Sequence, residues 1–532
     1  MTFPPDGHGP YRLLRGVHAR VVQSFDSACA RPEEIQATRL SAVLGQVTGT
    51  VVGRAHGLDP SMGLAAFRDA VPVRPHAGWS DWLDRVAAGE PGVMTRDPVR
   101  MLLETSGTTG RPKWLPVTDA WARSVGEAQS LWILGMLRDD GRLAGGRALS
   151  IVSPAVHGTS PGGLPVGANT GRMFLAQPWW VRLRAPVPYA VYGVADPDLR
   201  AYAILRHALA APVRSWTTAN PSTILAYCRH MARWWDALSA DCAEGTLRHG
   251  PAAGLTASER RALGAWPGRF PRARLPSVPR PAAVWDLCRV SCWKGGSASF
   301  FLSRLPEALG ADVPVREAGV NASEGSFAVP VDDDGPVAWL GGHLLEFLDD
   351  DGHARWAWEV EEGRTYRLVV TTEAGLLRYD MGDVVRVTGW CGRAPRLAFV
   401  RRAGNVLNAT GEKLTEDQLV AAVRVAMPAV AGFVCSLGWA ERPWVRVAVE
   451  GDVDVARAAA VLDRALRDGN VEYDAKRETD RLGTPEVVRV PAGAFAAWKG
   501  ARVRAGAPEA QVKDPVVWES PRWDAFVRGE ES

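Results

Sequence analysis

The segment at residues 105–113 constrains this chain more than any other part of its sequence. It reads Thr-Ser-Gly-Thr-Thr-Gly-Arg-Pro-Lys, which combines several hydroxyl side chains with two glycines and a lysine. Glycine lets the backbone approach an anion closely, and hydroxyl, backbone N–H and ammonium groups bind phosphate oxygens. An apolar run at 99–103 precedes the segment, and Thr118 or Asp119 can cap a helix that continues to about Leu137. The pattern predicts a strand, a phosphate-binding loop and a helix start.

The spacing excludes the ordinary P-loop of GTPases and kinases. That motif has four residues between its glycines and a lysine directly after the second one. Here only two residues separate Gly107 from Gly110, and two more precede Lys113. A flexible surface turn is the alternative, but it does not explain so many ordered donors. The order of residues resembles the phosphate loop of adenylate-forming enzymes, which assigns ATP binding to Ser106, Gly107, Thr108, Thr109, Gly110 and Lys113.

Composition argues against several other classes of protein. The chain has 532 residues, enough for more than one domain, and its net charge of +3 gives no reason to expect a nucleic-acid partner. No apolar run reaches the length of about 18 residues that spans a membrane, and the N-terminus lacks the pattern of a signal peptide. The seven cysteines favour neither a disulfide framework nor a zinc site. We therefore expect a cytoplasmic protein that acts on small molecules.

The pattern of apolar residues indicates a large α/β part followed by a smaller α+β part. Alternation predicts strands at 366–371 and 383–388, joined by a turn at 373–375. After Gly404 helices and strands alternate over shorter distances, with helices expected at 414–426 and 453–467 and strands at 432–437 and 444–449. We expect a boundary after residue 403, and the resemblance to adenylate-forming enzymes implies that residues 1–403 form an N-terminal ATP- and acyl-acid-binding domain and residues 404–532 a C-terminal lid.

A carboxylate motif at Asn321-Ala322-Ser323-Glu324-Gly325 complements the phosphate loop. ATP is used with Mg²⁺, a hard cation that binds one or two carboxylates together with phosphate oxygens. Glu324 is the candidate ligand for the metal, and Ser323 is a candidate contact to ATP. A Ser-Glu pair that caps a helix is the structural alternative.

A second acidic motif follows the strand at 366–371. The run Arg378-Tyr379-Asp380-Met381-Gly382-Asp383 resembles the Arg-Thr-Gly-Asp segment of adenylate-forming enzymes. In that comparison Asp383 accepts both ribose hydroxyls and Tyr379 belongs to the ATP site, whereas a simple hairpin turn is the alternative. Arg402, at the end of the next expected strand, is a cation suited to ribose or phosphate.

Taken together, these motifs resemble the Gretchen Hagen family of acyl acid amido synthetases, the auxin-responsive promoter family within the adenylate-forming superfamily. The resemblance spans nearly the whole chain, with matching segments at 52–58, 67–73, 374–384, 399–413 and 511–515 and a matching spacing of Asn470, Tyr473 and Arg477. Two features depart from the family pattern. Val320 precedes Asn321-Ala322-Ser323-Glu324 where the family has Tyr-Ala-Ser-Ser-Glu, so Trp293 is a candidate for the missing adenine contact. No arginine follows Pro515.

The resemblance implies an ATP- and Mg²⁺-dependent ligase that forms C–N bonds. A carboxylic acid attacks ATP to give acyl-AMP, and an amine, by resemblance an amino acid, then takes the acyl group. Lys513 is expected to contact the α-phosphate during catalysis. Lys413 is a second catalytic candidate, for which a structural ion pair is an equal alternative. His157 and Thr159, in a glycine-rich loop, are candidates for the acid or amine site, although His157 also suits an ordinary hydrogen-bonded loop position.

Two competing functions stay open at this point. One is an acyl-CoA or carrier-protein ligase of the same superfamily, which shares the phosphate loop but not the 511–515 segment. The other is a non-catalytic nucleotide-binding protein. The sequence selects neither the acid, nor the amine, nor an oligomeric state.

Overall fold

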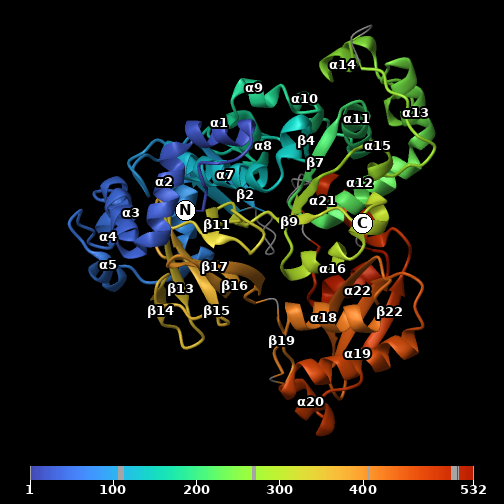
Figure 1. Ribbon diagram of the computed structural model, residues 1–532. Coiled ribbons are helices and arrows are strands. Elements are labelled where there is room, and N and C mark those ends of the chain that lie inside the picture. The colour runs from blue at the N-terminus through green and yellow to red at the C-terminus, as the bar shows by residue number, and fades with distance from the viewer. Residues whose placement is uncertain are drawn as a thin grey trace. The chain divides into compact units, whose positions relative to one another are not determined.

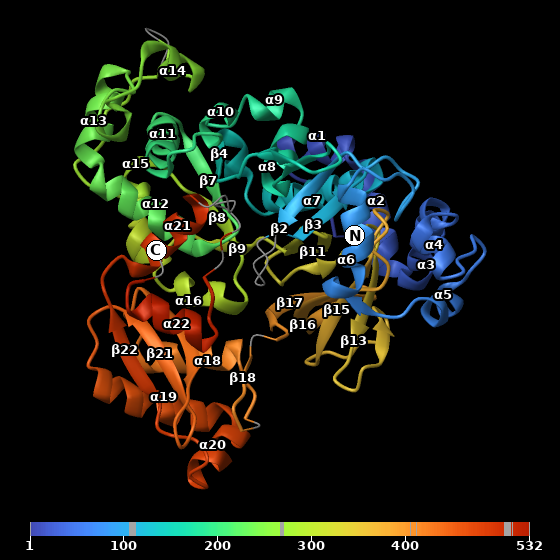
Figure 2. The same cartoon turned by 180° about the vertical axis from the view of Figure 1, so that it is seen from behind.

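The computed structural model describes residues 2–105, 113–266, 271–404, 406–410, 412–504, 512 and 514–530. These residues divide into two compact units. The first contains mainly residues 1–294 and 304–398, and the second contains 295–303, 399–507 and 512–532 (Figures 1 and 2). No helix in the described ranges combines the length and apolar character needed to cross a membrane.

The first unit begins with a run of helices, of which α3 contacts β13 (Leu344–Leu348) of its largest sheet. They are α1 (Gly9–Val17), α2 (Ala19–Ala30), α3 (Pro32–Val47), α4 (Val51–Ala55), α5 (Leu64–Ala70) and α6 (Ser80–Ala87). Gln36 of α3 is fully buried, and its amide donates to the carbonyl oxygens of Leu340 (2.7 Å) and His343 (2.8 Å). The same side chain accepts from the N–H of Leu345 at 2.9 Å. A buried amide therefore satisfies backbone groups at the start of a central strand, which ties the helices to the sheet.

The largest sheet has nine strands in the order β10-β11-β12-β17-β16-β15-β13-β14, with β1 (Arg74–Pro75) added beside β16. The bounds are β10 (Val320–Ala322), β11 (Gly325–Val329), β12 (Val337–Ala338), β13 (Leu344–Leu348), β14 (Ala354–Trp356), β15 (Thr365–Thr371), β16 (Tyr379–Cys391) and β17 (Ala394–Arg402). The two strands predicted at 366–371 and 383–388 are confirmed as β15 and β16. The turn between them is confirmed by Gly375, which has φ +92° and whose added Cβ would lie 2.3 Å from the Met94 carbonyl oxygen.

Two smaller sheets complete the first unit. One has the order β3-β2-β6-β5, and the other has the order β4-β7-β8-β9 with all neighbouring strands parallel. The bounds are β2 (Met101–Thr105), β3 (Lys113–Val117), β4 (Arg147–Ser150), β5 (Gly158–Thr159), β6 (Pro165–Gly167), β7 (Val213–Thr217), β8 (Arg289–Cys292) and β9 (Val315–Glu317). Parallel strands require crossover connections, which here contain α11 (Pro197–Leu209), α12 (Pro221–Arg233) and α13 (Trp235–Glu244).

The second unit is an α+β fold around a three-stranded sheet. Its order is β20 (Gly432–Gly438), β21 (Trp444–Glu450) and β22 (Glu486–Val490), with the first pair antiparallel and the second parallel. The helices are α18 (Glu416–Ala426), α19 (Val455–Gly469), α20 (Val471–Glu478), α21 (Ala494–Arg504) and α22 (Ser520–Val527). The four elements expected after Gly404 are confirmed as α18, β20, β21 and α19. The assignment of residues 1–403 and 404–532 to separate functions stays a prediction.

Candidate active site

The predicted phosphate loop joins two antiparallel strands. Thr105 ends β2 and pairs with Lys113, the first residue of β3. Thr118 caps α7 (Asp119–Asp139), as predicted, by accepting from the N–H of Trp121 at 3.2 Å. The five residues of β3, about 17 Å of extended chain, lie between the loop and this helix. Ser106, Gly107, Thr108, Thr109 and Gly110 lie outside the described residues.

Ser323 and Glu324 occupy the turn between β10 and β11. Glu324 is buried, and its backbone carbonyl accepts from the indole Nε1 of Trp121 at 2.6 Å. The first turn of α7 therefore holds the carboxylate motif, and Figures 1 and 2 show α7 beside β11. The alternative that this Ser-Glu pair caps a helix is wrong, since a strand follows it. One buried carboxylate is the type of protein ligand that Mg²⁺ accepts alongside phosphate oxygens, so Glu324 suits a metal–ATP complex.

A close approach behind Glu324 explains the glycine that follows it. A Cβ added to Gly325 would lie 2.5 Å from Nε2 of His343. His343 is fully buried, and this burial lowers its pKa to about 3, so its imidazole is neutral at physiological pH. An uncharged ring therefore packs against the turn that carries Glu324.

Asp383 lies in a β-bulge rather than in a hairpin turn. Arg367 of β15 pairs with Val384, whereas Val369 pairs with Asp380, so three residues of β16 oppose the single residue 368. Gly382 provides the positive φ of +72° within this bulge. Bulges redirect side chains near functional sites, and this one sets the direction of Asp383. The hairpin-turn alternative is wrong.

The neighbouring residues of this motif have structural roles. Arg378 is buried and forms an ion pair with Glu346, at 2.9 Å between Nε and Oε2. The Tyr379 ring is buried, and its hydroxyl lies 3.3 Å from Nδ1 of His76. These contacts anchor the start of β16. An ATP-binding role for Tyr379 stays a prediction.

His157 directly precedes β5 and faces a carboxylate. Its Nε2 lies 3.6 Å from Oε1 of Glu104, near the end of β2. The backbone N–H of His157 donates to the Val166 carbonyl. Glu104 also accepts from Nε1 of Trp114 at 3.2 Å. The neighbouring imidazole of His157 lowers the pKa of Glu104, although burial raises it. Thr159, two residues after His157, is exposed and shares its strand face.

Trp293 and Glu317 mark the carboxyl edge of the parallel sheet. Trp293 follows β8, and Glu317 ends β9, where it accepts from the N–H groups of Lys294 (2.9 Å) and Ala318 (2.9 Å). Burial raises the pKa of Glu317 to about 6. Ligands of open α/β sheets bind at this edge. The position of Trp293 is therefore compatible with the expected adenine contact, which stays a prediction.

The remaining candidates lie in the second unit. Arg402 ends β17, and Lys413 is an exposed residue with φ +45°. No ion pair joins Lys413 to a carboxylate of the described residues, and its catalytic role stays a prediction. Lys513 lies outside the described residues. Its neighbour Val512 is buried in the core of this unit, and Asp514 accepts from Nζ of Lys499 at 2.7 Å.

The family-like spacing of Asn470, Tyr473 and Arg477 has a structural explanation. Asn470 caps α20 and donates to the Glu412 carbonyl at 3.0 Å, so it joins the helix to the segment that carries Lys413. Tyr473 and Arg477 both donate to Asp463, each at 2.8 Å. These residues stabilise the fold of the second unit.

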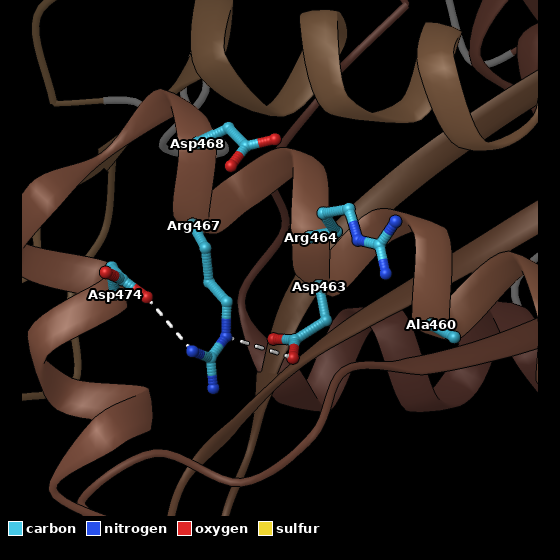
Figure 3. Close-up of a pocket in the computed structure, with 6 residues that line it drawn as sticks. All are labelled: Ala460, Asp463, Arg464, Arg467, Asp468 and Asp474. Atoms are coloured by element: carbon cyan, nitrogen blue, oxygen red, sulfur yellow. Dashed lines mark hydrogen bonds and ion pairs between the residues drawn. The ribbon is translucent and has the colours of Figure 1, made fainter.

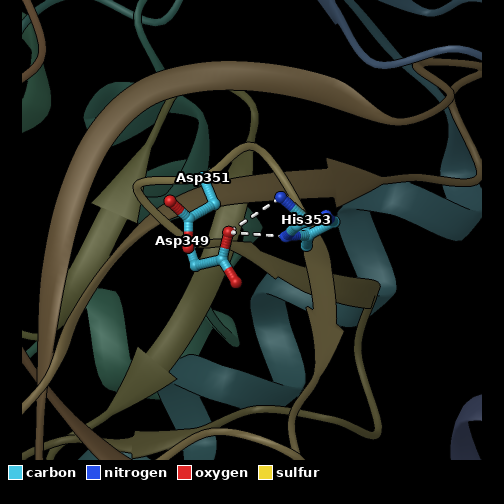
Figure 4. A group of neighbouring side chains, drawn as sticks. All are labelled: Asp349, Asp351 and His353. Atoms are coloured by element: carbon cyan, nitrogen blue, oxygen red, sulfur yellow. Dashed lines mark hydrogen bonds and ion pairs between the residues drawn. The ribbon is translucent and has the colours of Figure 1, made fainter.

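A surface cavity and a cluster of polar side chains are each explained by contacts within the protein, without a ligand. A surface cavity of about 420 Å³ is lined by Ala460, Asp463, Arg464, Arg467, Asp468 and Asp474 (Figure 3). Arg467 bridges two of its carboxylates, at 3.3 and 3.0 Å. Asp349, Asp351 and His353 form a cluster in the turn between β13 and β14 (Figure 4). Asp349 there accepts from the His353 N–H at 2.8 Å and from Arg355 at 3.2 Å, which accounts for its burial in the turn.

The structure therefore joins two pairs of segments that are distant in sequence, α7 with the Glu324 turn and β2 with the His157 loop. Sequence reasoning missed Trp121 and Glu104. Glu104 had a detectable signal, because it is the charged residue that interrupts an apolar strand directly before the phosphate loop. Trp121 had no such signal, because a tryptophan in an amphipathic helix usually belongs to the hydrophobic core.

Comparisons with known proteins identify the family of this chain. Three family models match, described as the GH3 family N-terminal domain (residues 21–315), central domain (340–402) and C-terminal domain (428–522). Jasmonoyl–L-amino acid synthetase JAR6 of Nicotiana attenuata is 24% identical, over 90% of this chain and 89% of that protein. Indole-3-acetic acid-amido synthetase GH3.8 of Oryza sativa subsp. indica is 26% identical, over 76% of this chain and 71% of that protein.

Solved structures show the same fold. GH3.15 acyl acid amido synthetase superposes with a TM-score of 0.84 at 20% identity, covering 99% of this chain and 97% of that chain. A 2-hydroxyisobutyryl-CoA ligase with a bound acyl adenylate is more distant, with a TM-score of 0.51 at 16% identity, covering 96% and 92% of the two chains. The large α/β part with a smaller α+β part is thereby confirmed. The chain belongs to the GH3 family and is an acyl-adenylate-forming amide ligase.

Proposed function

We propose that this ligase uses ATP and Mg²⁺ to activate a small carboxylic acid as acyl-AMP and then joins the acyl group to an amino acid. The observation that carries the proposal is the contact between Trp121 and Glu324, which places a buried carboxylate against the helix that follows the phosphate-loop hairpin. The named substrates of the plant relatives, jasmonate and indole-3-acetate with amino acids, support the chemical class. All seven cysteines are free thiols, which suits a cytoplasmic enzyme.

Each step of the proposed reaction depends on particular residues of this chain. ATP phosphates bind the loop at Ser106, Gly107, Thr108, Thr109, Gly110 and Lys113, with Ser323 nearby in the motif of Glu324. Glu324 would hold Mg²⁺, which neutralises phosphate charge when bound. Asp383 accepts the ribose hydroxyls, with Tyr379 and Arg402 completing the nucleotide site. Lys513 stabilises the negative charge that develops on the α-phosphate, and Lys413 is the second cation proposed for catalysis.

Activation is needed because a carboxylate is a poor electrophile. Attack of its oxygen on the α-phosphate forms the acyl-AMP bond and releases pyrophosphate. An amine then attacks the acyl carbon, and AMP leaves with the electron pair of the broken C–O bond. His157 and Thr159 are proposed to lie on the side of the acid and the amine.

A pyrophosphate-exchange screen over a panel of carboxylic acids tests the proposal. The enzyme should catalyse exchange with at least one acid and then form an amide when amino acids are added. Lys513→Ala should reduce exchange far more than it reduces ATP affinity, whereas Lys476→Ala is a matched control, because Lys476 pairs with Glu472 in α20. Equal losses of exchange and ATP affinity in the Lys513 variant would indicate a packing role.

Two further measurements separate the remaining possibilities. Asp383→Ala should raise the ATP concentration needed for exchange, and a normal ATP affinity would contradict the ribose assignment. Coenzyme A tested as the acceptor in place of amino acids distinguishes an acyl-CoA ligase. Absence of both ATP binding and exchange with every acid would refute the proposed activity.

A further inference from the structure

Glu104 and His157 form a carboxylate–imidazole pair beside the predicted phosphate loop. Their side chains are 17% and 28% exposed, with 3.6 Å between Oε1 and Nε2. Trp114, which is paired with Glu104 across the β2–β3 hairpin, donates its indole N–H to the other carboxylate oxygen. The carboxylate is therefore held from two sides, and one of those sides is the imidazole.

The glycine of β6 makes this pair possible. A Cβ added to Gly167 would lie 1.7 Å from the Ala155 carbonyl oxygen, so no other residue permits the segment before His157 to run so close. Gly167 pairs with Leu103, the residue before Glu104. The backbone is thus arranged to bring the 155–157 segment against the end of β2.

The pair determines which ring nitrogen of His157 is available. The carboxylate faces Nε2 at 3.6 Å, which favours the neutral tautomer with the hydrogen on Nε2 and the lone pair on Nδ1. Nδ1 makes no hydrogen bond to any described residue. The side chain is more than a quarter exposed, so a small molecule can reach the ring.

The second half-reaction needs such a base. An amino acid is an ammonium ion at neutral pH and cannot attack a carbonyl until one proton is removed. A positioned histidine contributes about 10²–10⁴-fold to such a step. A carboxylate behind the imidazole stabilises the imidazolium that forms when it takes the proton.

We infer that His157 removes the proton from the attacking amino group and that Glu104 is the positioning residue that orients His157. The inference rests on the proposed function. One ammonium proton passes to Nδ1, and the freed lone pair forms the C–N bond. The C–O bond to AMP then breaks, and AMP takes its electron pair. The remaining excess proton on nitrogen goes to solvent, and His157 returns its own proton to solvent before the next turnover.

Two acceptors distinguish this role from a general contribution to folding. The first is the preferred amino acid, and the second is hydroxylamine, which is largely unprotonated at neutral pH and needs no base. Glu104→Gln and His157→Gln should reduce transfer from acyl-AMP to the amino acid by about 10²-fold or more. The same variants should reduce hydroxamate formation much less. Glu104→Asp should restore part of the amino-acid transfer.

Matched variants complete the test. Glu244→Gln removes the carboxylate of an exposed pair, 3.2 Å from Nε2 of His249, and should change neither acceptor. Trp114→Phe removes one donor to Glu104 and keeps an aromatic ring, so it reports on the pair if Glu104→Gln does not fold. It should lower amino-acid transfer more than hydroxamate formation.

The outcomes separate this inference from the function on which it rests. If the unmodified enzyme exchanges pyrophosphate but the variants lose both acceptors equally, the inference is overturned and the proposed function stands. Normal amino-acid transfer in Glu104→Gln also overturns it. If the unmodified enzyme shows no exchange with any acid, both are overturned.

Discussion

Glu346 gives the sharpest prediction about how the first unit is held together. This glutamate of β13 is 1% exposed, and it accepts from Nε and Nη2 of Arg378 at 2.9 and 3.0 Å. It also accepts from Nε of Arg68 in α5 at 2.8 Å. One carboxylate therefore joins α5 and the start of β16, the strand that carries Asp383.

Glu346→Gln keeps the shape of the side chain but removes its charge. Breaking a buried pair by removing one partner costs about 3–5 kcal/mol, because the other charge stays buried. Arg378 is 8% exposed and cannot turn to water, whereas Arg68 is 20% exposed and has partial access to it. We therefore expect the lower end of that range, about 3 kcal/mol, which is roughly a hundredfold in the opening equilibrium.

Hydrogen–deuterium exchange of peptides from β13 and β16 measures this change locally. It is preferable to a single melting curve, because a chain of two units need not unfold in one step. The protection of the backbone amides in these strands should fall about a hundredfold. The ATP concentration needed for pyrophosphate exchange should rise as well. Glu90→Gln is the matched control, since Arg85 binds Glu90 through two hydrogen bonds at an exposed site. A loss of protection no larger than the one measured for that surface pair would refute the reasoning.

Three further predictions test other parts of the fold. Asp463→Asn should destabilise the second unit by about 2 kcal/mol at pH 7. Burial raises the pKa of Asp463, but the hydrogen bonds that it accepts from α20 outweigh the effect of burial and lower the pKa. Its contribution is present above the ordinary aspartate pKa of about 3.9 and is lost as the pH falls through the lower folded-state value, so the difference measured by urea unfolding should shrink as the pH is lowered below that ordinary value; a difference that does not change with pH would contradict this. Gly167→Ala should lower the melting temperature and amide formation, because its Cβ would lie 1.7 Å from a carbonyl oxygen, whereas Gly45→Ala has open space and should do neither. Cys391 should be alkylated faster at pH 7 than the other cysteines, as seen by mass spectrometry, because the Cys29 thiol lowers its pKa to about 6, and Cys29→Ala should remove that advantage.

Local chemistry explains which predictions are confirmed. The strands β15, β16, β20 and β21 follow from alternating apolar residues bounded by turns, and Thr118 caps α7 because its hydroxyl reaches a nearby N–H. Both signals depend on neighbours within a few residues. These signals can therefore be recognised in the sequence without knowledge of the partner strands.

The strand β3 after the phosphate loop was not predicted, and the reason is the opposite one. The segment Lys113–Val117 becomes a strand because β2 supplies its hydrogen-bonding partners, and a short run containing a proline gives a weak strand signal by itself. The bulge at Gly382 and Asp383 likewise depends on the register of β15. Strand pairing is a property of two segments, so neither feature could be predicted from one.

Residue types and their spacing already define the chemical groups of this ligase: the hydroxyl- and glycine-rich loop, the carboxylates Glu324 and Asp383, and the order of the elements in the second unit. Which polar groups lie next to one another depends on the packing of the folded chain. It placed Glu104 beside His157, gave Arg378 to Glu346 and joined Trp121 to the Glu324 turn. The physical reason is that composition and spacing act along the chain, whereas hydrogen bonds and ion pairs depend on distances in space that the packing of distant segments creates.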